Sequence, residues 1–134
     1  MEKYFANYEQ SLALKELGFD MPCFAYVYTG DTGNNVDRYE EVEPSRAINF
    51  NHDSLCISQP LKSQVFEWFR KEHHMFSHIM TYEGNEIPRF KGEFAYFAEI
   101  DFLIASEEIE KPFKTYEEAE SACIDRLIEI VKNR

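Results

Sequence analysis

A strict alternation of apolar side chains over residues 94–104 constrains the fold more than any other feature of the sequence. Apolar residues stand at every second position, which is the period of a β-strand: Phe94, Tyr96, Ala98, Ile100 and Phe102. The other face is mixed, because Glu99 and Asp101 stand among apolar residues. This pattern is typical of an antiparallel sheet with one covered face. We therefore predict one continuous strand over residues 94–104.

The first two predicted helices cover residues 8–17 and 61–72. Asn7 and Gln10 have the spacing of a capping box at the start of the first helix, and Gly18 supplies its stop. The second helix carries its apolar residues on one side, which is the amphipathic pattern of a helix that packs against a sheet. Pro60 suits its first turn.

A third helix is predicted to begin after Thr115, which forms a capping box with Glu118. Its inner face is predicted to hold Tyr116, Ala119, Cys123, Leu127 and Ile130. Ile128 falls on the polar side of this helix, so it is predicted to be exposed.

The remaining strands are predicted from alternation and from the turn formers that separate them. They cover residues 23–29, 36–42, 54–58 and 75–82. The short stretch 54–58 is a possible extra strand, and without it the order is α-β-β-α-β-β-α. The expected fold is α+β, with a single antiparallel or mixed sheet and about three helices. No low-complexity stretch divides the chain, so residues 1–134 are expected to form one domain.

The charge balance excludes some classes of partner. The chain has 25 acidic and 14 basic residues and a net charge of -11. A field of this sign does not attract nucleic acid or anionic lipid, so neither direct nucleic-acid binding nor membrane binding is expected. The charge promotes solubility. Alternatively, the acidic surface mimics a nucleic acid and blocks a basic protein.

The cysteines and the N-terminal residues indicate the cellular compartment of the protein. Cys23, Cys56 and Cys123 are odd in number and far apart, so neither a disulfide framework nor a zinc site is expected. Free cysteines suit a reducing interior. No apolar leader or membrane-spanning run is visible, and the expected location is cytoplasmic.

Two groups of polar residues are candidates for chemistry. Glu99 and Asp101 share one face of the predicted strand, and paired carboxylates can perform acid–base work; His78 is a further member of this possible polar site. His73, His74 and His78 resemble a metal-binding cluster, but the spacing is not that of HExxH. Helix-end and loop roles explain these histidines equally well. No metal or cofactor is expected.

Two further groups complete the candidates. Cys56 with His52 could form a thiolate pair, although only closeness in sequence supports it. Phe24, Tyr26 and Tyr28 point to one side of the first predicted strand. They form a binding patch if that side is partly exposed, because aromatic residues are enriched at protein interfaces. If the side is covered, they belong to the core.

Three stretches carry a resemblance to a known group of proteins. They are LKELGFDMPC (residues 14–23), SQVFEWFR (63–70) and TYEEAESAC (115–123), the last continuing into residues 127–132. Together they resemble a family of small uncharacterised proteins common in phages, prophages and gut Bacteroidetes. The resemblance covers about a third of the chain. It implies a cytoplasmic protein encoded by a mobile element, and it implies no activity.

These observations lead to one expectation and two alternatives. The expected function is that of a non-enzymatic accessory protein that acts by binding another protein or by self-association. One alternative is a small enzyme or ligand-binding domain that uses Glu99 and Asp101 or the histidines. The other is the acidic nucleic-acid mimic. Whether the chain is an enzyme stays open at this point.

Overall fold

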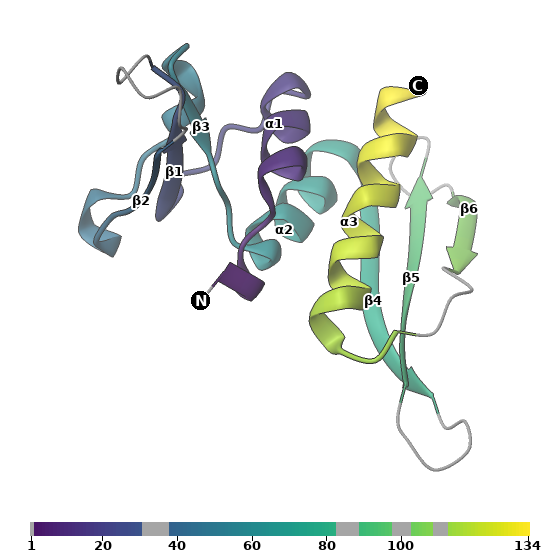
Figure 1. The fold of residues 1–134 in the computed structure, drawn as a ribbon. Helices are drawn as coiled ribbons and strands as arrows, with labels where there is room; N and C mark the ends of the chain where they lie inside the picture. Colours follow the sequence, from purple (N-terminus) through teal and green to yellow (C-terminus); the bar gives the residue numbers. More distant parts are fainter. Residues whose placement is uncertain (1, 31–37, 83–88, 98–102, 109–112) are drawn as a thin grey trace. The chain divides into compact units, whose positions relative to one another are not determined.

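The computed structural model describes residues 2–30, 38–82, 89–97, 103–108 and 113–134. Figure 1 shows the course of the chain. Its elements are, in order, η1 (Glu2–Tyr4), α1 (Tyr8–Glu16), β1 (Ala25–Tyr28), β2 (Arg38–Glu41), η2 (Pro44–Arg46), η3 (Phe50–His52), β3 (Cys56–Ser58), α2 (Lys62–His73), β4 (Met75–Tyr82), β5 (Arg89–Phe97), β6 (Leu103–Glu108) and α3 (Tyr116–Lys132). The α+β class is confirmed.

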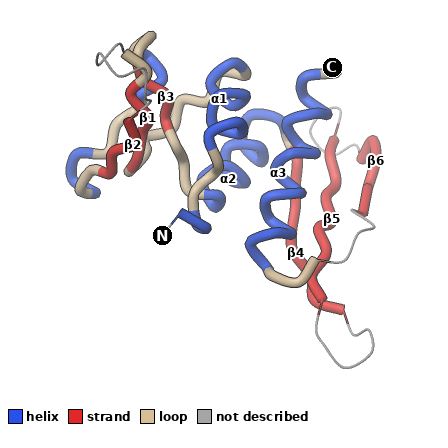
Figure 2. The backbone as a smooth tube through the Cα atoms, in the orientation of Figure 1, coloured by secondary structure: helices blue, strands red, loops and turns tan. Residues whose placement is uncertain are grey.

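Internal contacts divide the chain into two compact units, unit 1 (Met1–Gln64) and unit 2 (Val65–Arg134). Each unit has its own three-stranded antiparallel sheet, with the order β2-β1-β3 in unit 1 and β4-β5-β6 in unit 2. Figure 2 shows the strands of both sheets. The prediction of one sheet was therefore wrong, since the described strands form two. The expectation of a single domain over residues 1–134 stays a prediction.

Helix α1 has the local signals that the sequence indicated. The Asn7 side chain accepts a hydrogen bond from the Gln10 amide at 2.8 Å, and the Gln10 side chain accepts one from the Asn7 amide at 3.0 Å. These reciprocal bonds satisfy two donors that a helix start leaves unpaired. Gly18 adopts a φ of 93° just after the helix, a conformation that favours glycine. The helix buries Leu14 completely.

The central strand of unit 1 is β1, and it has two different faces. Cys23, Ala25 and Val27 are buried, whereas Phe24, Tyr26 and Tyr28 are half-buried. This is the alternation predicted for residues 23–29, and it follows from the two-residue period of a strand. The sheet therefore places its small apolar side chains in the core of unit 1 and its aromatic side chains at the surface.

In unit 2, helix α3 lies on the sheet and contacts β4 and β5 (Figure 1). Its N-cap is Thr115, whose hydroxyl accepts a hydrogen bond from the Glu118 amide at 3.1 Å, as predicted. The helix buries Ala119, Cys123, Ile124, Leu127 and Ile128. Trp68 and Phe69, from the predicted apolar side of α2, are also buried.

Two predictions for α3 were wrong. Ile128 is only 6% exposed, and Tyr116 at the first turn is 46% exposed. The buried arc of the helix includes both Ile124 and Ile128, so it is wider than the single stripe assumed from the sequence. A residue at the very start of a helix also has fewer neighbours, which accounts for the exposure of Tyr116.

The predicted strand over residues 94–104 was also wrong, because it is two strands. β5 ends at Phe97, β6 begins at Leu103, and these two residues are antiparallel partners. Residues 94–104 contain no glycine, proline or asparagine to mark a turn. Apolar alternation alone does not distinguish one long strand from two adjacent ones.

Helix α2 passes into β4 through one strained residue. His74 has a φ of 53°, in the left-handed region that residues with a Cβ rarely adopt. This conformation lets β4 begin at Met75, directly after the helix, and β4 has the predicted bounds of residues 75–82. Among the described residues, no helix is long and apolar enough to cross a membrane.

Candidate binding face on the first sheet

The half-buried side of β1 carries a cluster that we name the aromatic face: Phe24, Tyr26, Tyr28 and Phe50. Tyr26 and Tyr28 come from the strand itself, Phe24 directly precedes it, and the three were predicted together. The Tyr26 and Phe50 rings are stacked, with centroids 4.3 Å apart and planes inclined by 24°. Stacked aromatic pairs of this kind add stability beyond the area that they bury. The structure therefore stacks two of the four rings of this face against each other.

Polar bonds hold Phe50 in place beside the strand. The Phe50 amide donates to the Ser58 hydroxyl at 2.9 Å, and the Ser58 amide donates to the Asn51 side-chain oxygen at 2.8 Å. The Asn51 side-chain amide donates in turn to the Phe19 carbonyl at 2.9 Å. Ser58 and Phe19 are both buried. This network fixes the turn η3 against β3 and so positions the Phe50 ring on Tyr26.

A carboxylate is attached to the aromatic face. Tyr26 and Glu40 are partners across β1 and β2, so they lie on the same side of the sheet. The Tyr26 hydroxyl donates to Glu40 Oε2 at 2.7 Å. The next residue, Glu41, is the partner of Ala25 and accepts from the Tyr39 hydroxyl at 2.7 Å. The two glutamates therefore belong to opposite sides of the sheet.

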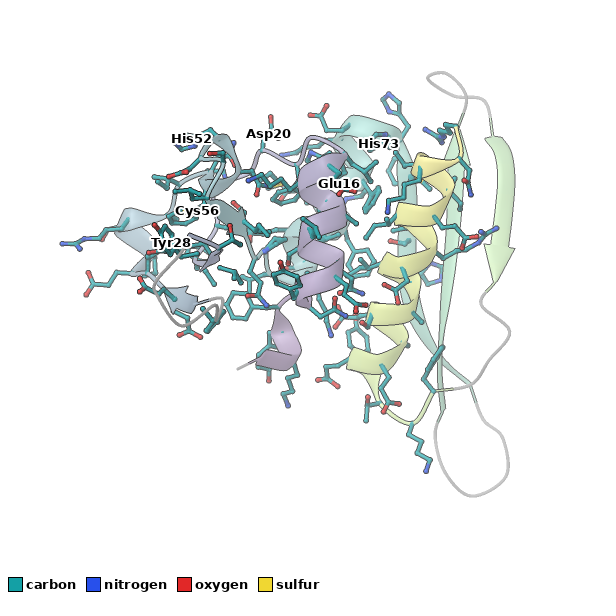
Figure 3. All side chains as sticks on the ribbon, turned by 45° about the horizontal axis from the view of Figure 1, so that its top comes forward. Glu16, Asp20, Tyr28, His52, Cys56 and His73 are labelled. Atoms are coloured by element: carbon teal, nitrogen blue, oxygen red, sulfur yellow. The ribbon has the colours of Figure 1, made fainter. Side chains whose placement is uncertain are left out.

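Tyr28 lies at the end of the aromatic face, and its ring is close to Gly30. A Cβ atom added at Gly30 would collide with the Tyr28 ring and hydroxyl. The glycine therefore leaves room for the ring to fold over the backbone that follows the strand. Tyr28 on β1 and Cys56 on β3 are partners across the two strands, and both are labelled in Figure 3.

The Cys56 thiol does not have the properties of a nucleophile. Cys56 is 8% exposed, and burial raises the pKa of its thiol, with the Asp53 carboxylate raising it further against a smaller lowering by Lys15. The Lys15 ammonium bonds instead to the Asp53 and Cys56 carbonyls, at 2.9 and 2.5 Å. His52 is exposed at the end of η3. The hydrogen bonds described for this region include none between Cys56 and His52, so the suggested thiolate pair has no geometric support.

The other two cysteines are buried in the cores of their units. Burial raises the pKa of Cys23 and of Cys123 to about 12. The thiols therefore stay protonated at neutral pH, which is the inert state of a cysteine. All three cysteines are free.

The three candidate histidines have different surroundings. The half-buried His73 ring packs edge-on against the buried Trp68, with centroids 4.8 Å apart. His74 is exposed at the strained turn, and His78 is exposed on β4 as the partner of Glu93. In the described part of the chain, no group of three or more His, Cys, Asp or Glu residues could hold a metal ion.

The other members of the possible polar site, Glu99 and Asp101, lie outside the described residues. Sequence reasoning found three of the four members of the aromatic face but missed Phe50 and the role of Glu40. Residues 47–53 carry no clear periodicity, and Phe50 reaches Tyr26 only through the tertiary bonds around Ser58. Comparisons with protein-family models, with curated proteins and with solved structures find no match to this chain.

Proposed function

We propose that this chain is a non-enzymatic accessory protein of a phage or other mobile element, and that it acts by binding another protein through the aromatic face. The observation that carries the proposal is the two-sided nature of β1 and of the residues directly before it. Its small side chains fill the core, while Phe24, Tyr26 and Tyr28 remain half-buried at the surface. Aromatic side chains supply most of the binding energy at many interfaces, because they bury a large area with few rotatable bonds.

The surroundings of the aromatic face favour binding over chemistry. Its rings are fixed by stacking and by the bonds around η3, so little conformational entropy is lost when a partner covers them. The nearest thiol, Cys56, is held in its protonated form. Three free cysteines and the sequence resemblance support a cytoplasmic setting for this interaction.

Site-specific photo-crosslinking tests the proposal. A photoreactive phenylalanine analogue replaces Tyr28 in one sample and Tyr116, an exposed aromatic residue on α3, in a matched control. Both are irradiated in a lysate of the organism that encodes the chain. We expect one defined protein adduct from position 28, none from position 116, and loss of the adduct when Phe50→Ser is added.

Circular dichroism must first show that the Phe50→Ser variant is folded. The same adducts from both positions, or none from position 28, would contradict the proposal. An adduct from position 28 that survives Phe50→Ser would also contradict it, because the partner would then contact Tyr28 without using the stacked rings.

A further inference from the structure

We draw no further inference here: the strongest candidate, the surface patch of exposed apolar side chains that η1 and α1 carry at Tyr4, Tyr8 and Leu12, supports no proposal, because nothing in the structure shows what covers it.

Discussion

His73 is half-buried at the end of α2, where its ring contacts that of Trp68, the only tryptophan of the chain. The Phe69 ring is also near, with its centroid 5.7 Å from that of His73. His73 Nε2 is buried and has no hydrogen-bond partner among the described residues. Burial lowers the pKa of His73, and the positive charge of Arg134 and the neighbouring His74 lower it further, against an opposing contribution from Glu72. The neutral imidazole is therefore the form that suits the folded state.

The stability of unit 2 should consequently decrease in acid. An unfolded histidine binds a proton near pH 6.5, whereas folded His73 binds one only at lower pH. Between these two values the unfolded state holds more protons, so stability is complete above about pH 6.5 and is lost as the pH falls toward the folded pKa. We expect the urea midpoint, followed by Trp68 fluorescence, to decrease over this range in the wild type and to decrease less in His73→Phe.

His52→Phe is the control for this measurement, because His52 is exposed on η3 in unit 1. Its midpoint should depend on pH as that of the wild type does. An equal pH dependence in the wild type and in His73→Phe would show that protonation of His73 does not destabilise the fold.

At the scale of the secondary-structure element, the capping box of α1 provides a clear prediction. Asn7→Ala removes the acceptor for the Gln10 amide and should lower the free energy of unfolding by about 1 kcal/mol. Asn7→Asp keeps an acceptor at the same position and should retain most of the stability. Urea unfolding followed by circular dichroism distinguishes the two variants. If both variants lose a similar amount of unfolding free energy, the side chain of Asn7 stabilises the protein by something other than capping.

Helices whose starts carry local signals were predictable from the sequence. The pairing of strands that are distant in the sequence was not. Asn7 and Thr115 mark helix starts through bonds to residues three positions later, so the sequence alone contains both partners. The division into two sheets depends on pairings such as that of Phe97 with Leu103, which no local pattern specifies. Residues 94–104 contain no glycine or proline and keep an unbroken apolar alternation, and for that reason β5 and β6 were predicted as one strand.

The candidate site shows the same limit. The period of the strand predicted over residues 23–29 alone indicated that Phe24, Tyr26 and Tyr28 share a side. Phe50 and Glu40 join them through the pairing of β1 with β2 and through bonds to Ser58, and residues far apart in sequence make these contacts. Sequence reasoning therefore identified the strand that carries the site, while the structure was needed to show the stack and the carboxylate.

At the scale of the whole molecule, the two compact units share one helix. α2 begins at Lys62 in unit 1 and continues into unit 2 through Val65 and Phe69, which are both fully buried. Its first turn is held in unit 1, where the Gln64 side-chain amide donates to the Pro22 carbonyl at 2.7 Å. A helix is costly to start and depends on its first turn. Unfolding of unit 1 should therefore weaken α2 and, with it, the core of unit 2.

This coupling predicts that the chain unfolds as one domain, and the cysteines make the prediction measurable. Cys23 in unit 1 and Cys123 in unit 2 are both fully buried, so each thiol reacts only after its own unit opens. We expect pulsed thiol labelling across a urea series, with each site followed by peptide mass spectrometry, to give coincident midpoints. Cys56, which is 8% exposed in unit 1, serves as an internal check on Cys23. Separate midpoints for Cys23 and Cys123 would instead establish two independently stable domains, and α2 would then be a connection that either unit can lose without unfolding the other.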